Sequence, residues 1–473
     1  MNLDVTTLLE SFPSARWFGG KGRPIKNIEV VDFGVVEDGP PALVFSILRV
    51  LFADEGQEQL YHLPLTVDDG ITSDAMDDPD RLRILGDLMA HGTSIKGHEG
   101  VFQFSGPGLD PLAPPGDSIR VMSAEQSNTS LVLDESVIVK VFRRVEVGTN
   151  PDLELTRFLT NESFEHVPLH LGEFIYEGEI DDKEISIDLG IAQRFMADSV
   201  EGWTKTLQDL DHFYGEVNDL DAREDMRFLT EERAEEIFRS IEELGEVTAS
   251  LHVALSRAEG VAELTPEPID KFDLDEWAQR AKASLSNLME GSAPELTGTA
   301  GAIVERIDAL RSIEEPGAKL RIHGDYHLGQ VLHSSRGWMI LDFEGEPARS
   351  LEERRAKQSP LRDAAGLLRS FNYAAIAALF ARTEPGSDDW ERLEPWAEMW
   401  ETVARERFLR GYLTRSHEGD FLPPDREELL TMLDVFEIDK ALYELAYEHG
   451  HRPDWVRIPL RGIAQVLERE PAR

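Results

Sequence analysis

The pattern of hydrophobic and polar positions changes from strand-like to helix-like along the chain. Apolar residues alternate or run together in three early stretches, residues 28–36, 42–53 and 59–67. Such stretches, separated by Gly and Pro, predict β-strands. A short helical pattern follows at residues 82–88, and four prolines and three glycines then crowd residues 106–116. We therefore expect a β-rich region of about a hundred residues that ends in a linker.

A second strand-rich pattern runs from Ile119 to about Met196. Two apolar runs, residues 131–133 and 137–142, flank Asp134-Glu135-Ser136 and predict a β-hairpin. Asn150-Pro151 then predicts the start of a helix, with Asn as the N-cap and Pro in the first helical position.

Beyond Gly202 the apolar positions follow a helical period. The long amphipathic stretches are residues 231–257, 361–381, 390–412 and 427–449. A β-hairpin over residues 331–343 interrupts them. The pattern therefore predicts an α+β protein whose C-terminal part is mainly helical.

Composition adds charge to this picture. The 473 residues include 91 Asp or Glu against 48 Lys or Arg, which gives a formal net charge of −43. A chain this acidic repels phosphate backbones and anionic lipids, so nucleic acids and membranes are not expected partners. Because 41% of the residues are hydrophobic, the charge indicates a solvated surface rather than disorder. The length predicts two or three domains. The absence of cysteine excludes disulfides, thiolate metal sites and a Cys nucleophile.

We expect a soluble, cytoplasmic protein. The N-terminal segment carries Asp4 and Glu10 and no basic region, which is not typical of a secretory signal. The most apolar stretch, residues 42–52, contains Arg49 and is too short to span a bilayer.

The strongest chemical signal is the segment His323-Gly324-Asp325, which follows a short strand. Gln330 comes five residues after Asp325, and Asp342 follows the next hairpin. Phosphoryl transfer needs one carboxylate to orient the attacking hydroxyl and oxygen ligands to hold Mg²⁺. We therefore predict Asp325 as the catalytic base and Gln330 and Asp342 as metal ligands. A metal site on His323 and His327 is the weaker alternative, and His323 is expected to give the loop its shape.

A second signal is a lysine on an otherwise apolar strand. Lys140 lies between Ile138 and Phe142 on one strand face and needs a charged partner if it is buried. Glu154, one turn into the next helix, is the expected partner, and Asp152 on the same helix is the open alternative. A strand lysine tethered by a helix acid binds nucleotide phosphates in kinases. A lysine whose charge reaches solvent at the sheet edge is the structural alternative.

Two segments are expected to surround ATP with Lys140. Ser127 and Thr129 lie in a glycine-free loop before the strand, where small side chains and backbone N–H groups could line phosphate. Gln193 and Phe195 end a later strand and are expected to form the hinge that binds adenine. The segment GGKGR at residues 19–23 is not a P-loop, because it lacks both the first glycine and the Ser or Thr after the lysine.

A third signal lies on the last long helix. Lys440, Tyr443 and Glu444 belong to an apolar and aromatic stripe, and a lysine in such a stripe breaks the hydrophobic pattern. Aromatic faces with a few charged groups suit a sugar. A Lys440–Glu444 surface pair is the alternative. Asp363, in the first turn of another helix, could support the catalytic loop or simply complement the helix dipole.

The segments RIHGDYHLGQVL, FEIDKALYELAYEHGHRPDWVRIPL and RWFGGKGR closely resemble bacterial maltokinases. The resemblance extends over the whole chain and implies a two-lobed kinase fold of the aminoglycoside phosphotransferase type. It implies an N-terminal cap over residues 1–110, a kinase N-lobe over 111–200 and a helical C-lobe over 201–473. RWFGGKGR is expected to be a structural bridge from cap to kinase lobe.

The family phosphorylates the anomeric hydroxyl of maltose with ATP and Mg²⁺, for α-glucan synthesis from trehalose. Position by position, the resemblance gives the predicted catalytic, metal and phosphate-binding residues the same roles and implies that Lys440, Tyr443 and, more weakly, Glu444 contact maltose. A trehalose-isomerising enzyme is a possible partner. The alternatives are a kinase for another sugar such as glucosamine or a hexose, a non-catalytic kinase-like protein, and an aminoglycoside-resistance phosphotransferase.

Overall fold

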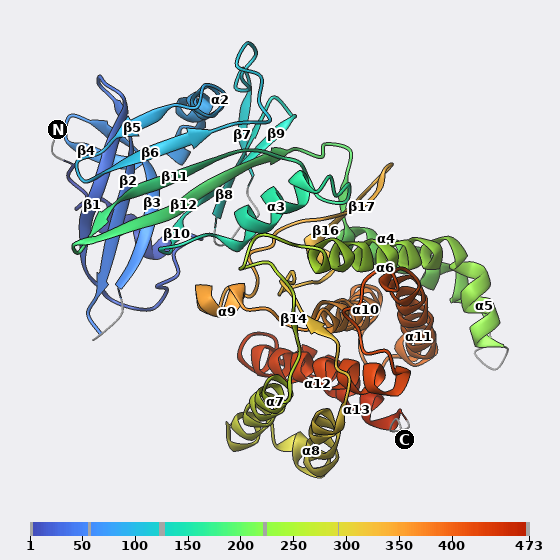
Figure 1. The fold of residues 1–473 in the computed structure, drawn as a ribbon. Helices are drawn as coiled ribbons and strands as arrows, with labels where there is room; N and C mark the ends of the chain where they lie inside the picture. The colour runs from blue at the N-terminus through green and yellow to red at the C-terminus, as the bar shows by residue number, and fades with distance from the viewer. Residues whose placement is uncertain (1–2, 55–57, 123–127, 221–224, 292, 470–473) are drawn as a thin grey trace. The chain divides into compact units, whose positions relative to one another are not determined.

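The computed structural model describes residues 3–54, 58–122, 128–220, 225–291 and 293–469. The chain forms two compact units, Met1–Ala197 and Asp198–Arg473. The first holds two antiparallel sheets, and the second is mainly helical (Figure 1).

The first sheet of the N-terminal unit consists of the early strands. Its order is β1 (Ile25–Glu37), β2 (Ala42–Phe52), β3 (Glu58–Asp68) and β10 (Arg144–Val145), with β4 (Ile71–Asp74) paired to β3. The three apolar stretches of the sequence are thus confirmed as neighbouring strands. Helix α1 (Leu8–Ser11) precedes them, and α2 (Ile84–Ala90) forms where residues 82–88 predict a helix.

The second sheet has seven strands. Their order is β5 (Ser94–Lys96), β6 (Gly100–Ser105), β11 (His170–Ile180), β12 (Lys183–Arg194), β9 (Val137–Phe142), β8 (Asn128–Leu133) and β7 (Ile119–Val121). The predicted hairpin is β8–β9, and Asn150 caps α3 (Pro151–Asn161) by accepting the N–H of Asp152 at 2.8 Å. Strand β6, inside the expected cap, pairs with β11, so the strands of the expected cap and kinase lobe share one compact unit.

The segment RWFGGKGR packs on the first sheet and beside the junction between β9 and β10. The Arg143 guanidinium, which is fully buried, lies 4.6 Å from the Trp17 ring centre and pairs with Asp74. Gly20 packs so closely on Phe52 that a Cβ would overlap the phenyl ring. These contacts support a structural role for the segment, because Arg143 links β9 to β10.

The C-terminal unit is a helical bundle with a small sheet. Its helices are α4 (Gly202–Val217), α5 (Met226–Arg233), α6 (Glu235–Ser256), α7 (Lys271–Gly291), α8 (Ala300–Asp308), α9 (Leu351–Arg355), α10 (Leu361–Arg382), α11 (Asp388–Ser416), α12 (Arg426–His451) and α13 (Arg457–Glu468). The sheet order is β13 (Val200–Glu201), β16 (Val331–Ser334) and β17 (Gly337–Ile340), and β14 (Glu267–Pro268) pairs with β15 (Ala318–Lys319).

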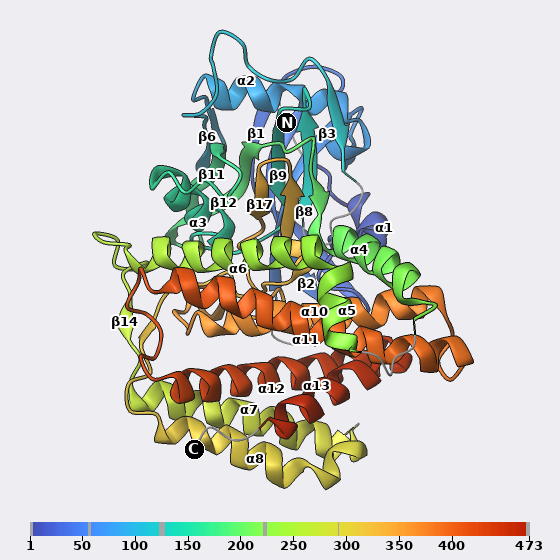
Figure 2. The same cartoon turned by 90° about the vertical axis from the view of Figure 1, so that its right-hand side faces the viewer.

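Two packing relationships within this unit position the candidate site. Helix α12 packs against α10 on one side and α7 on the other (Figure 2). Helix α10 is long and apolar enough to cross a membrane, but most of its residues are buried inside the unit, which is ordinary for a core helix. The site described below lies where α12, α10 and the loops after β15 and β17 meet.

Candidate functional site

Asp363 anchors the loop that contains Asp325. The Asp363 carboxylate, in the first turn of α10, accepts the N–H groups of His323 at 2.8 Å and Gly324 at 3.0 Å. It also lies 3.1 Å from His252 Nε2. Burial raises the pKa of Asp363, but the hydrogen bond and charge of His252, together with His323 and the Gly324 N–H, outweigh burial and hold that pKa below its usual range. These are the bonds that the predicted support role of Asp363 requires, and the role itself stays a prediction.

His323 also holds this loop in place. Its Nε2 is 2.7 Å from the Leu341 carbonyl, and its Nδ1 accepts the Asp325 N–H at 3.4 Å. The ring also packs 5.1 Å from both Tyr326 and Phe343. Both ring nitrogens have partners in the protein, which is compatible with the predicted structural role of His323 and disfavours the alternative role of metal ligand.

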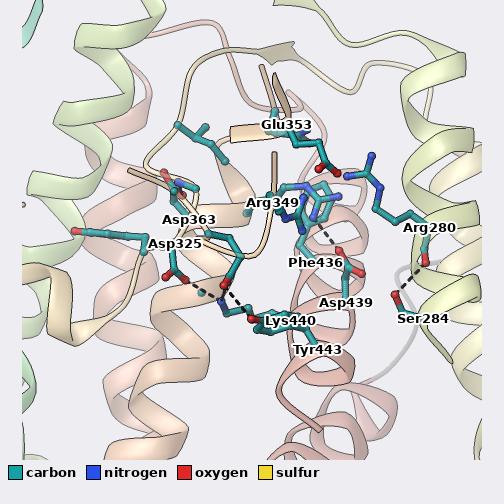
Figure 3. Close-up of a pocket in the computed structure, with 18 of the residues that line it drawn as sticks. Arg280, Ser284, Asp325, Arg349, Glu353, Asp363, Phe436, Asp439, Lys440 and Tyr443 are labelled. Atoms are coloured by element: carbon teal, nitrogen blue, oxygen red, sulfur yellow. Dashed lines mark hydrogen bonds and ion pairs between the residues drawn. The ribbon is translucent and has the colours of Figure 1, made fainter. Parts of the chain in front are cut away.

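Asp325 points toward a lysine from α12. Lys440 Nζ lies 3.1 Å from Asp325 Oδ1 and 3.8 Å from Glu346 Oε2, and His327 Nε2 lies 3.9 Å from Asp325 Oδ2 (Figure 3). Burial raises the pKa of Asp325, but Lys440 and then His327 overcome burial and hold that pKa below its usual value. The carboxylate is therefore ionised at neutral pH, ready to orient a hydroxyl group.

Glu346 is a site residue that the sequence analysis missed. It accepts a hydrogen bond from the Tyr443 hydroxyl at 2.9 Å, and burial followed by the nearby Asp325 raises its pKa. The Lys440 ammonium also lies 5.2 Å from the Tyr443 ring centre. The residue lies in a loop with no hydrophobic period, so nothing in the sequence distinguishes it from the other acids of the chain.

Glu444 lies elsewhere. Its carboxylate accepts two hydrogen bonds from the Arg369 guanidinium, at 2.8 and 2.9 Å, inside the bundle. It is not among the residues that line the cavity beside Asp325, whereas Lys440 and Tyr443 are. The surface pair that the sequence allowed between Lys440 and Glu444 is therefore replaced by two separate pairs, Lys440–Asp325 and Arg369–Glu444.

A cavity of about 400 Å³ opens beside Asp325. Its polar lining comes from α7, α12 and the loops after β15 and β17, as Figure 3 shows. Arg362, also in the lining, donates to Asp439 at 2.8 Å and lies 4.5 Å from the Phe436 ring centre. The volume falls within the ordinary range for small-molecule sites, and its polar groups suit a ligand with many hydroxyls.

The two predicted metal ligands lie at the same end of the β16–β17 hairpin. Val331 pairs with Ile340, and the Leu341 N–H donates to the Gln330 carbonyl at 2.9 Å. Asp342 has a positive φ of 63°, which is uncommon for a residue other than glycine and ends the strand there. Amide and carboxylate oxygens are ligands that Mg²⁺ prefers, so the residue types fit that ion.

In the N-terminal unit, Lys140 pairs with the acid that the sequence left as an alternative. Lys140 Nζ lies 3.1 Å from Asp152 Oδ2, and both side chains are largely buried. Asp152 is the second residue of α3, and Glu154, named first from the sequence, is also buried on this helix. A lysine held by the first turn of this helix is compatible with the predicted phosphate contact.

The remaining predicted nucleotide residues are only partly described. Ser127 lies outside the described residues, while Thr129 is in β8 opposite Val141. Gln193 donates from its side chain to Thr156 Oγ1 at 3.3 Å. The Phe195 N–H donates to the Ser136 carbonyl at 2.8 Å, so any adenine recognition by residues 193–196 depends on their other backbone groups.

Comparison with known families agrees with this geometry. Residues 12–90 match the maltokinase N-terminal cap domain, and residues 203–396 match the phosphotransferase enzyme family. The chain thus combines a region that matches a maltokinase cap with a region that matches the phosphotransferase enzyme family. The match over residues 203–396 includes Asp325, Gln330, Asp342 and Asp363, so the anchored loop lies inside the phosphotransferase region.

Two curated proteins and several solved structures are similar to this chain over most of its length. A glucosamine kinase of Mycolicibacterium smegmatis is 22% identical over 74% of this chain and 79% of that protein. Another of Streptacidiphilus jiangxiensis is 24% identical over 75% of each. A solved glucosamine kinase in complex with glucosamine, ADP and inorganic phosphate covers 99% of this chain and 100% of its own, with 18% identity and a TM-score of 0.67. A further crystal form gives a TM-score of 0.68, at 19% identity over 96% of this chain and 97% of its own. These likenesses confirm the predicted kinase-like fold.

Proposed function

We propose that the protein is a maltokinase with an N-terminal cap, which transfers the γ-phosphoryl group of ATP to the anomeric hydroxyl of maltose. The observation that carries this proposal is the ionised Asp325, anchored by Asp363 and held by Lys440 beside a polar cavity. The match of residues 12–90 to a maltokinase cap supports maltose as the sugar. The product is maltose 1-phosphate.

In the proposed reaction, Asp325 orients the C1 hydroxyl and accepts its proton as the new O–P bond forms. Lys440 neutralises Asp325 in the resting site and donates hydrogen bonds to the sugar hydroxyls. Gln330 and Asp342 would hold Mg²⁺, which, when bound, neutralises charge on the phosphates. Lys140, positioned by Asp152, binds the phosphates of the nucleotide.

Glucosamine is the second candidate substrate, because the similar proteins that are named are glucosamine kinases. The cavity's charges weigh against it. Glucosamine carries an ammonium group near neutral pH, but the two acids beside the reaction centre, Asp325 and Glu346, already share the Lys440 ammonium. A second cation would have to displace the first, and like charges at close range are unfavourable. A neutral sugar meets no such conflict.

The proposed product places the enzyme between two reactions. Maltose 1-phosphate is an activated maltosyl donor for α-glucan synthesis, and maltose can come from trehalose by isomerisation. We propose that the enzyme works in the cytoplasm with a trehalose-isomerising enzyme, as a functional or physical partner.

A panel of sugars tests this proposal. The purified protein with Mg²⁺ and ATP would be assayed by coupled ADP release with maltose, glucose, glucosamine and maltotriose, and the products identified by NMR. We expect the highest kcat/KM with maltose and a phosphate on C1. A higher kcat/KM with glucosamine would replace maltose by the second candidate, while no ADP release with any sugar would support the non-catalytic alternative.

A further inference from the structure

One wall of the cavity is not used by the proposed reaction. Arg280, Ser284 and Asn287 line it from α7, opposite the α12 wall that carries Lys440. Their spacing of four and then three residues places them on one face of the helix, on which Figure 3 labels Arg280 and Ser284. At 1.5 Å per residue, the stripe from Arg280 to Asn287 extends about 10 Å along the cavity.

The polar groups of this wall have hydrogen-bonding capacity left over. Arg280 donates to Glu276, one turn earlier on the same helix, at 2.9 Å, and uses one of its nitrogens to do so. Asn287 is exposed on the same wall, where its amide can exchange water for a ligand. The charge of the Arg349 guanidinium, which also lines the cavity, opposes the rise that burial causes in the pKa of Glu346. It also adds to the lowering of the pKa of Glu353 by the Ser350 hydrogen bonds. Donors and acceptors of this kind suit neighbouring hydroxyls of a pyranose ring.

The two walls together exceed the needs of one sugar ring. On α12 the lining residues run from Phe436 to Ala446, about 15 Å of helix. The reacting hydroxyl must lie at Asp325, so a ring placed there meets Lys440 and Tyr443. The α7 stripe would then contact a group that lies beyond this first ring, and that group must be uncharged or acidic because Arg280 and Arg349 are both cations.

We propose that the α7 stripe, with Arg280 and Asn287 as its principal donors, binds the second, non-reducing glucose unit of the substrate. This inference rests on the proposed function, since it assigns the two rings of an α-linked disaccharide to two walls of one cavity. The stripe then determines specificity: it contributes affinity that a single hexose cannot obtain, while Asp325 and Lys440 act on the ring that is phosphorylated.

Variants of α7 test the assignment. Asn287→Ala and Arg280→Met would be compared with the parent for maltose and glucose, with glucose measured as a competitive inhibitor if it is not turned over. Removing one good hydrogen bond should raise the KM for maltose about tenfold. We expect kcat with maltose and the constant for glucose to stay within about twofold, because neither residue contacts the reducing ring.

Two controls match these variants. Ser286→Ala changes the neighbour of Asn287, and this exposed side chain bonds to Glu290 outside the cavity. Glu276→Ala breaks the same ion pair as Arg280→Met but leaves the lining intact. Both controls should keep the parent's maltose KM. Thermal melting would show that all four variants fold.

The outcomes separate the two proposals. If the parent prefers maltose but the α7 variants leave its KM unchanged, or affect maltose and glucose equally, the second-ring subsite is wrong and the proposed function stands. If the parent phosphorylates glucosamine and not maltose, the proposed function fails, and the subsite fails with it. A selective loss on maltose supports the subsite.

Discussion

Asp325 is the single residue on which the proposed chemistry depends. Its loop is held by Asp363 and His323, so Asp325→Asn should keep its position and lose only the charge that accepts a proton. We expect turnover to fall by at least about a hundredfold. Nucleotide affinity, measured by calorimetry with Mg·ATP, should change less than threefold. Turnover near that of the parent would remove Asp325 from the role of base.

Lys440 lowers the pKa of Asp325 and, in the proposed site, also contacts the sugar. The ammonium is a principal cause of the low pKa of Asp325, so Lys440→Met should raise that pKa. Activity needs the ionised carboxylate and falls as pH drops through its pKa, so the acidic limb of the kcat/KM profile should move to higher pH. We also expect the sugar KM to rise.

A charge change elsewhere provides the control for this profile. Lys357→Met removes a lysine that pairs with Glu267 and does not line the cavity. Its acidic limb should match the parent's. If Lys440→Met raises the sugar KM but leaves the acidic limb of the kcat/KM profile at the same pH, Lys440 contributes to sugar binding and not to the ionisation of Asp325.

At this scale the sequence predicted residue types better than partners. Asp325 could be predicted from the motif, because the proposed reaction needs a carboxylate in this loop. Asp363 could be predicted from its place in the first turn of a helix, where a carboxylate can accept N–H groups of the loop. The Lys440–Asp325 pair joins residues 115 positions apart, and the choice of Asp152 beside Lys140 depends on the rotation of α3. Neither pair can be predicted from residues close in sequence, and no local sequence pattern marks Glu346 as a site residue.

At the scale of elements, local signals predicted the hairpins and helix starts. Asn150-Pro151 and the β8–β9 turn form through contacts between residues that are close in sequence, so the sequence alone predicts them. The predicted elements were too long where the hydrophobic pattern continued past the end of the strand or helix. The predicted strand to Phe343 ends at Ile340, because Asp342 adopts a left-handed backbone, and the amphipathic stretch from residue 231 divides between α5 and α6.

Asp188 on β12 offers a test of how α3 is attached. Its buried carboxylate accepts the Asn150 N–H at 2.7 Å, and burial raises the pKa of Asp188 to about 6. A raised folded-state pKa means that the ionised group destabilises the fold above pH 6, and this penalty disappears as pH falls toward the unfolded value. Asp188→Asn keeps an acceptor without the charge. We expect it to stabilise the protein by about 1–3 kcal/mol at pH 8 and less at pH 5.

Urea denaturation at both pH values measures this effect. Asp182→Asn is a suitable control, because Asp182 is exposed in the turn that precedes β12 and has a positive φ that Asn also tolerates. The control should alter stability equally at the two pH values. A destabilised Asp188→Asn at pH 8 would mean that the charge strengthens the bond to Asn150 more than burial penalises it.

At the scale of the whole molecule, the net charge of −43 has two components. A few acids are paired with cations inside the bundle. Burial raises the pKa of Glu437, for example, but Arg405 and Arg469 lower it to about 2. Such pairs depend on contact and are little affected by salt. Most of the excess acids lie on the surface, where their mutual repulsion opposes the compact state over distances that salt can screen.

Salt should therefore stabilise this protein. Raising NaCl from about 20 mM to about 500 mM shortens the screening length from roughly 20 Å to roughly 4 Å, which weakens repulsion across the surface more than attraction within contacting pairs. We expect the melting temperature to rise by several degrees, and by the same amount in KCl, because the effect depends on ionic strength rather than on a bound ion. A melting temperature that falls with salt would mean that surface ion pairs such as Arg410–Glu242 and Arg227–Glu406 outweigh the repulsion.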